Sequence, residues 1–284
     1  SAHLPSHSLF FQAKLEGSRY ETEIVGFIFT HHKKLKSVNL PEGVTKIGCR
    51  AFGYCILLEW IALPSTISEI CASAFSGCGN LKSVTLPEGL HTIGRYAFEN
   101  CSSLECITLP STVSEISQYA FSSCTNLNSV SILEGVQKIG RRAFQGCSSL
   151  KSIDLPSTVS EVGIGAFRNC YELKTVNLPE GIQRVRSDAF TNCASLERIV
   201  FHALSKQTEA LPAAVQTEME RKINRTDGVI MEAGEVSISP AAIREGDFDN
   251  NWSAQITKLR RIARLIAYCE VREITTILEL ALWK

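Results

Sequence analysis

The sequence predicts an α/β repeat solenoid, a stack of short coils that each add a strand to a parallel sheet. A leucine recurs every 23 residues, at Leu35, Leu58, Leu81, Leu104, Leu127, Leu150, Leu173 and Leu196. A phenylalanine inside an Ala-Phe pair recurs with the same period, at Phe52, Phe75, Phe98, Phe121, Phe144, Phe167 and Phe190. One coil of this length cannot bury such side chains alone, so equivalent side chains on stacked coils must bury one another.

Each coil begins with a predicted strand. In the segment 35–40, Leu35, Val38 and Leu40 are apolar, and the end of the segment alternates with polar residues, as in a strand with one buried face. Pro41 follows and has no backbone N–H, so it ends the strand. The same segment recurs in the later coils.

Two further elements complete each coil. After a turn at Glu42-Gly43, Val44 and Ile47 return to the core on a second short extended segment. The segment 51–55 follows and contains the Ala-Phe pair, for which we predict a short helical turn.

Seven of the eleven cysteines occupy one position of the repeat, namely Cys55, Cys78, Cys101, Cys124, Cys147, Cys170 and Cys193. Equivalent residues on stacked coils lie about 4.8 Å apart with parallel Cβ vectors, whereas a disulfide needs Cβ atoms about 3.8 Å apart. We therefore expect a column of buried thiols that act as small apolar side chains. Such a column favours a reducing compartment.

The second extended segment predicts a ladder of charges. Its outward residues are Lys46, Glu69, Thr92, Glu115, Lys138, Glu161 and Arg184. Opposite charges on neighbouring strands gain roughly 0.2–1 kcal/mol per pair, and like charges repel. The last four residues should therefore alternate as a ladder that controls register more than it adds stability.

Residues 20–34 predict a degenerate first coil that caps the stack. Displacement by one repeat aligns Ile24 with Ile47 and Phe29 with Phe52. A solenoid needs such a cap to shield its open end.

The repeat pattern stops after Ile199, and composition divides the rest of the chain. Residues 1–19 are an N-terminal tail before the solenoid of residues 20–202. Residues 203–251 are polar and mixed, which predicts a linker with a short helix. Residues 252–284 have apolar residues at helical spacing, which predicts a C-terminal amphipathic helix or helix pair.

The predicted C-terminal helix has two interpretations. Its polar side is basic and carries Lys258, Arg260, Arg261 and Arg264. It either covers an end of the solenoid or packs on itself, or it docks onto another protein or an anionic membrane surface. The sequence leaves both interpretations open.

Three motifs recur in each repeat: Leu-x-x-φ-x-Leu-Pro, φ-x-x-Ile and Ala-Phe-x-x-Cys, where φ is aliphatic, as seen from Leu81 to Cys101. In these motifs the chain resembles the bacterial-surface-antigen (BspA-like) type of leucine-rich repeat over about residues 20–202. The resemblance implies a curved, right-handed leucine-rich-repeat superhelix with a parallel β-sheet face. It also implies protein or ligand binding, and it carries over no catalytic residue.

Three strand positions in each coil face outward and form the best candidate binding surface. The middle position carries Ser37, Trp60, Ser83, Cys106, Ser129, Ser152, Thr175 and Arg198. The last position carries Asn39, Ala62, Thr85, Thr108, Ser131, Asp154 and Asn177. Hot spots in interfaces favour Trp and Arg. The candidate partner-binding residues are therefore Trp60, Thr85, Thr108, Asp154, Asn177 and Arg198; the alternative is that these side chains only solvate the sheet.

Composition and motifs argue against several function classes. Lys plus Arg and Asp plus Glu both number 29, so no net charge draws the chain toward nucleic acid. No run approaches 18 apolar residues, so we expect no stable membrane insertion. No phosphate loop, His-Glu-x-x-His motif, nucleophile elbow or Cys-x-x-Cys pair occurs. We expect no enzyme activity, no cofactor and no metal site.

We expect a non-catalytic protein-binding scaffold that uses the outward strand surface and holds a protein partner of unknown identity. The alternatives are a cell-surface adhesin that binds host or matrix proteins and a spacer with no ligand. The thiol column favours an intracellular, cytoplasmic location over the cell surface. The sequence does not set the oligomeric state.

Overall fold

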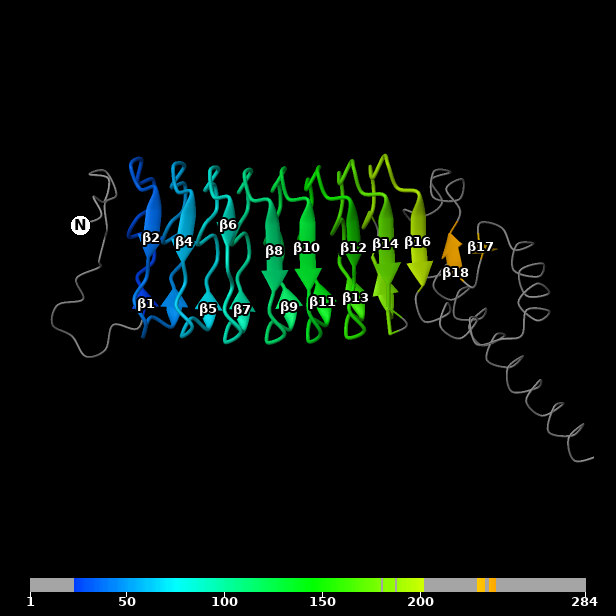
Figure 1. The fold of residues 1–284 in the computed structure, drawn as a ribbon, viewed down its shortest axis with the longest axis horizontal. Coiled ribbons are helices and arrows are strands. Elements are labelled where there is room, and N and C mark those ends of the chain that lie inside the picture. Colours follow the sequence, from blue (N-terminus) through cyan, green and yellow to red (C-terminus); the bar gives the residue numbers. More distant parts are fainter. Residues whose placement is uncertain (1–22, 180, 187, 202–228, 233–234, 239–284) are drawn as a thin grey trace, which may run out of the picture.

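The computed structural model describes residues 23–179, 181–186, 188–201, 229–232 and 235–238. Figure 1 shows a stack of similar coils whose strands lie in two rows. The fold is therefore a parallel β-solenoid with about one coil per repeat, as the 23-residue period predicts.

The first row of strands contains the segments that open each repeat. Its members are β2 (Ser37–Asn39), β4 (Trp60–Ala62), β6 (Ser83–Val84), β8 (Cys106–Leu109), β10 (Ser129–Ile132), β12 (Ser152–Asp154), β14 (Thr175–Leu178) and β16 (Arg198–Phe201). Within β2–β4–β6, β8–β10 and β12–β14–β16 the strands pair in parallel with a register of one repeat, so that Ser37 lies opposite Trp60 and Trp60 opposite Ser83. We call the outward side of this row the strand face.

The second row forms one continuous eight-stranded parallel sheet. Its members are β1 (Glu23–Ile24), β3 (Lys46–Ile47), β5 (Glu69–Ile70), β7 (Thr92–Ile93), β9 (Glu115–Ile116), β11 (Lys138–Ile139), β13 (Glu161–Val162) and β15 (Arg184–Val185). Ile24 lies opposite Ile47 at the start of this sheet. This pairing confirms that a degenerate coil precedes the first full repeat.

The phenylalanines form one interior column, as predicted. Neighbouring rings from Phe29 to Phe190 are stacked, with centroids 5.1–5.5 Å apart. The side chains from Phe52 to Phe167 are fully buried. Offset stacking at this spacing adds about 0.5–1.5 kcal/mol per aromatic pair beyond the burial of apolar area. The column is therefore the centre of the core and extends into the cap through Phe29.

The prediction of a helical turn at 51–55 is wrong, and the part of the chain that the structure describes contains no helix. In every coil, the residues two before and two after the column phenylalanine have positive φ, for example Arg50 at 54° and Tyr54 at 58°. The N–H of Phe52 donates to the carbonyl of Ala74 on the next coil at 2.8 Å. Alternate peptide groups thus bond between coils, which leaves no helical ladder within one coil. We call this third side of the coil the turn side.

The predicted ladder of charges lies on the second row of strands. Lys138 pairs with Glu115 at 3.2 Å, and Glu161 pairs with Arg184 at 3.8 Å and with Arg186 at 3.0 Å. The strand register places these residues opposite one another, coil by coil. All of the pairs are solvent-exposed to some degree and hence individually weak.

Beyond β16 the structure describes two strands that the sequence did not reveal. β17 (Val229–Glu232) and β18 (Glu235–Ile238) pair with each other in antiparallel orientation, and β18 pairs with β16. They lie within the range 203–251, for which we had predicted a linker with a short helix. That helix, the N-terminal tail and the C-terminal helix of residues 252–284 lie outside the described residues.

Replacement of one ring in the phenylalanine column should destabilise the solenoid strongly. Phe98 is fully buried between Phe75 and Phe121. We expect Phe98→Ala to lower the free energy of unfolding by about 3–5 kcal/mol, since it leaves a cavity and removes two stacking contacts. Urea denaturation followed by circular dichroism measures this, with Phe98→Leu as the milder control. A loss below about 1 kcal/mol for Phe98→Ala would contradict the role of the column.

The positive φ angles on the turn side should make some glycines there costly to replace. Gly146 has φ of 75°, and a Cβ there would lie no closer than 3.5 Å to another atom, in Ser123. Gly146→Ala therefore has space, and its cost of about 1–2 kcal/mol should come from the left-handed conformation alone. The control is Gly79→Ala, which has ordinary contacts at 3.6 Å and no positive φ. Equal thermal stability of the two variants would disprove the conformational explanation.

Candidate functional site

The strand face carries columns of exposed side chains, because the strands of the first row are in register. The middle column contains Ser37, Trp60, Ser83, Cys106, Ser129, Ser152, Thr175 and Arg198, and is exposed or half-buried throughout. The last column has the same character along Asn39, Ala62, Thr85, Thr108, Ser131, Asp154 and Asn177. Between the columns, Val38, Ile61, Val84, Ile107, Ile153, Val176 and Ile199 point into the core. The alternation that was predicted for these strands is confirmed.

The two predicted anchors stand at opposite ends of one column. Trp60 on β4 is 46% exposed, the only tryptophan among the described residues. Arg198 on β16 is also exposed and lies opposite Thr175. Six coil spacings separate Trp60 from Arg198, which amounts to about 29 Å at the usual distance between strands. One small ligand cannot touch both side chains, so they belong to an extended surface.

The remaining candidates fall into two groups on the last column. Asp154 and Asn177 lie opposite each other on β12 and β14, and the Asn177 amide donates a hydrogen bond to the Asp154 carboxylate. Arg198 lies on the following strand, two residues before the position opposite Asn177, and we call Asp154, Asn177 and Arg198 the polar cluster. Thr85 and Thr108 occupy equivalent positions on two earlier coils and are both exposed. They lie between the polar cluster and Trp60 along the solenoid.

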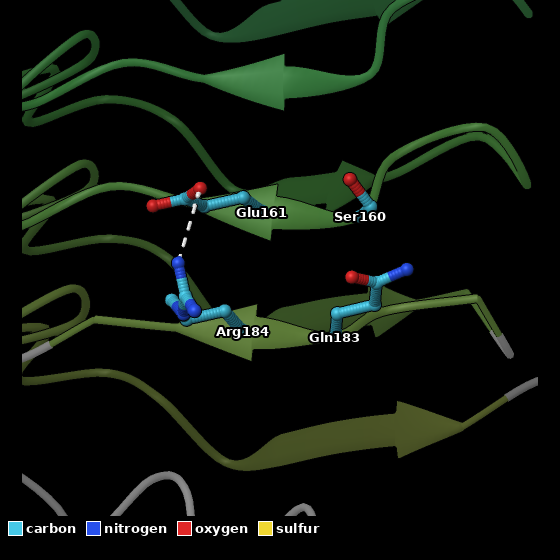
Figure 2. A pocket seen from close by; sticks show the side chains of 4 residues that line it. All are labelled: Ser160, Glu161, Gln183 and Arg184. Atoms are coloured by element: carbon cyan, nitrogen blue, oxygen red, sulfur yellow. Dashed lines mark ion pairs between the residues drawn. The ribbon is translucent and has the colours of Figure 1, made fainter.

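A shallow recess lies on the other row of strands, between β13 and β15. Ser160, Glu161, Gln183 and Arg184 line it, and Figure 2 shows the ion pair of Glu161 with Arg184 across it. The distance between these charged groups is 3.8 Å. The Glu161 carboxylate pairs with both Arg184 and Arg186. The recess belongs to the ladder of charges.

Within the described ranges, no group of three or more His, Cys, Asp or Glu side chains could hold a metal ion. Those same ranges contain no helix long and apolar enough to cross a membrane.

The buried thiol column is a structural feature of the coil. Each thiol donates to the carbonyl of the phenylalanine one coil earlier, as Cys78 does to Phe52, and the distances along the column are 3.0–3.3 Å. Burial raises the pKa of Cys55 to about 11 and that of Cys124 to about 12, and it raises the pKa of Cys101 well above its ordinary value. These sulfurs are therefore protonated and unreactive near neutral pH, as the sequence predicted for apolar packing groups.

The repeat identifies the family. A sequence profile described as the BspA type leucine-rich repeat region matches the chain with 6 copies, over residues 22–148 and 91–210. The two matches overlap and together cover most of the chain. The chain belongs to this family.

Solved structures of similar proteins come from several bacteria. A leucine-rich repeat protein of T. pallidum is 34% identical, with 57% of this chain and 68% of that chain covered and a TM-score of 0.42. A leucine-rich cell surface protein of Faecalibacterium prausnitzii is 23% identical, with 62% of each chain covered and a TM-score of 0.34. A leucine-rich repeat protein of Bacteroides ovatus is 21% identical, with 62% of this chain and 81% of that chain covered and a TM-score of 0.30. A comparison with curated protein sequences finds no match.

One column of the BspA-type strand face was not assigned from the sequence. The position just before the middle column carries Lys36, Glu59, Lys82, Glu105, Asn128, Lys151, Lys174 and Glu197. Lys82 and Glu59 form an ion pair at 3.9 Å. The 23-residue period that placed Trp60 on the strand face also predicts this column from the sequence. It adds a balanced row of charges to the small polar side chains.

The thiol column predicts loss of stability at alkaline pH. An unfolded thiol ionises near its ordinary pKa of 9.0, whereas the folded pKa values of Cys55 and Cys124 are about 11 and about 12. The stabilisation is therefore complete below pH 9.0 and is lost as pH rises toward about 11 or 12. Above pH 9.0 each thiol should contribute a slope of about 1.4 kcal/mol per pH unit.

Cys124→Ala should reduce that slope by one thiol's share, whereas Cys106→Ala, at an exposed cysteine, should leave it unchanged. Urea denaturation at a series of alkaline pH values measures the slopes. An unaltered slope in Cys124→Ala would mean that the column stays ionisable in the folded protein.

Proposed function

We propose that this BspA-type chain is a non-catalytic scaffold that binds a protein partner on its strand face. The observation that carries the proposal is the in-register surface on which small polar side chains surround Trp60, a tryptophan that is 46% exposed. A large aromatic side chain that remains exposed on an ordered strand is a typical hot-spot residue for protein recognition.

The chemistry of the face supports a macromolecular partner. Ser and Thr lose little side-chain entropy when a partner covers them, and they offer hydroxyl donors and acceptors along the surface. Eight coils give the face a length of about 34 Å, with one strand every 4.8 Å or so. A specific protein interface covers about 800 Å² per partner, and a surface of this length accommodates such an area far better than it encloses a small molecule.

The polar cluster of Asp154, Asn177 and Arg198 gives the second half of the face its own chemistry. The hydrogen bond from Asn177 fixes the Asp154 carboxylate on the surface. A partner that presents a cation next to a hydrogen-bond acceptor complements this end of the strand face. At the other end, the Trp60 side chain would enter an apolar pocket of the partner.

The cell-surface adhesin is the alternative, and it would use the same strand face. Geometry therefore does not separate the two, and the buried column thiols are too unreactive to report the compartment. Surface labelling of intact source cells does separate them. A chain protected from the label favours the intracellular scaffold, which we prefer, and a labelled chain favours the adhesin.

Substitutions on the strand face should weaken the partner without unfolding the chain. We expect a variant with Trp60→Ala, Asp154→Ala and Arg198→Ala to lose its specific partner in affinity capture. The amount of captured partner should fall at least about tenfold relative to the unaltered chain. The Trp60→Ala change alone should lower the free energy of unfolding by no more than about 1 kcal/mol. Mass spectrometry of the captured proteins, followed by Kd measurement with the purified partner, measures the loss of binding, and urea denaturation measures the change in stability.

A matched control changes the same residue classes away from the strand face. Tyr171, Glu172 and Arg184 are exposed and lie outside that face, so their replacement by Ala should leave capture unchanged. If the control and the strand-face variant lose the partner equally, or if neither loses it, the strand face is not the binding surface.

A further inference from the structure

The turn side carries a second surface that the proposed function does not use. Over four consecutive coils it presents four arginines and a pair of tyrosines, which we name the arginine–tyrosine surface: Arg95, Tyr96, Tyr119, Arg141, Arg142 and Arg168. Arg95 and Arg141 are exposed, and the other four side chains are half-buried. All belong to turn segments around the column phenylalanines.

Positive charge is concentrated on this side of the coil. The turn segments 94–100, 117–123, 140–146 and 163–169 contain four arginines and one acid, Glu99, which gives a net charge of +3. The strand-face segments of the same coils are neutral, because Lys82 and Lys151 are balanced by Glu105 and Asp154. A chain with no net charge has therefore placed an excess of cations on one face of its solenoid.

Contacts between coils hold these side chains in place. The rings of Tyr96 and Tyr119 are stacked with centroids 4.8 Å apart. The Arg142 guanidinium lies 5.7 Å from the Tyr119 ring centroid and donates a hydrogen bond of 2.9 Å to the Tyr119 hydroxyl. At the other end, Arg95 lies 6.0 Å from the Tyr96 ring and donates to Gln118. The guanidinium groups of Arg95 and Arg142 are thereby pre-oriented, which reduces the entropy lost when they bind an anion.

The one acid of the surface is already engaged. Glu99 is half-buried and accepts a hydrogen bond from the Ser76 hydroxyl at 3.3 Å. Among the described residues, no ion pair joins Arg95, Arg141 or Arg168 to a carboxylate. Their charge is thus available to an external anion.

We propose that the arginine–tyrosine surface docks an acidic, extended peptide segment of a protein partner. Guanidinium groups bind carboxylates in a planar, two-pronged geometry. Arg95 and Arg168 are three coils apart, or about 14 Å, a distance that an extended peptide covers with about five residues. A short run of Asp or Glu therefore matches the spacing of the cations.

Nucleic acid fits this surface less well than an acidic peptide does. Single-stranded nucleic acid binds by stacking its bases on free aromatic faces. Here one face of each tyrosine ring covers the other, and Arg142 lies against Tyr119. The surface therefore offers guanidinium groups that can bind an anion, but little free aromatic face on which bases could stack.

The test uses the full chain and a fluorescently labelled peptide of about eight glutamates, long enough to cover the site at the extended spacing. Fluorescence anisotropy at low salt gives Kd, and a peptide of alternating Glu and Lys is the composition control. We expect the glutamate peptide to bind, with an affinity that falls as salt rises. A variant with Arg95→Gln, Arg141→Gln and Arg168→Gln should weaken binding at least about tenfold.

The matched control removes three positive charges from the strand face instead, with Lys82→Gln, Lys151→Gln and Lys174→Gln. It should change Kd by less than about twofold, since the docking is local and the change in net charge is the same. Circular dichroism confirms that both variants remain folded. Equal losses in both variants, or no binding by the intact chain, would overturn the proposal. Tighter binding of a single-stranded oligonucleotide of equal charge would overturn the assignment to a protein partner.

Discussion

The stacking of one phenylalanine ring on the next is the constraint on which the rest of the structure depends. Ring centroids are 5.1–5.5 Å apart along the column, and the strands on both rows repeat with the same register of one coil. The hydrogen bonds between coils then repeat from one coil to the next, as from the N–H of Phe52 to the carbonyl of Ala74 and from the N–H of Phe75 to the carbonyl of Ala97. The interior column therefore decides which side chains meet on every outer face.

That register has a consequence for charge. Equivalent positions on neighbouring coils are side by side, so a run of like charges at one position would repel. On the second row of strands the chain alternates sign, as Lys138 does with Glu115. On the turn side no repeat position carries arginine on two consecutive coils, since Gln118 lies between Arg95 and Arg141 in the repeat. The first arrangement cancels charge, and the second accumulates it while avoiding like charges at equivalent positions of neighbouring coils.

The sequence predicted what the period controls and missed what local backbone geometry controls. A 23-residue count was sufficient for the phenylalanine and cysteine columns, the strands, and the exposure of Trp60. The count did not distinguish a helical turn from the non-helical turns that the structure shows around each phenylalanine, because both conformations bury one face with similar spacing. The position two after the phenylalanine indicates this conformation in five of the seven full repeats, because it contains Gly77, Asn100, Gly146, Asn169 and Asn192, which are residue types that favour positive φ. The contact of Asp154 with Asn177 could be inferred from register, but β17 and β18 have no repeat pattern to reveal them.

In a solenoid each coil contacts only its neighbours, so surfaces on different coils and sides behave as nearly independent sites. Trp60 is about 29 Å from Arg198 along the strand face, well beyond the Debye length of about 8 Å at physiological ionic strength. The turn side is separated from the strand face by the buried core of every coil. A substitution on one face should therefore alter recognition there and leave the other face intact, so one rigid stack of coils can hold two partners without coupling between them.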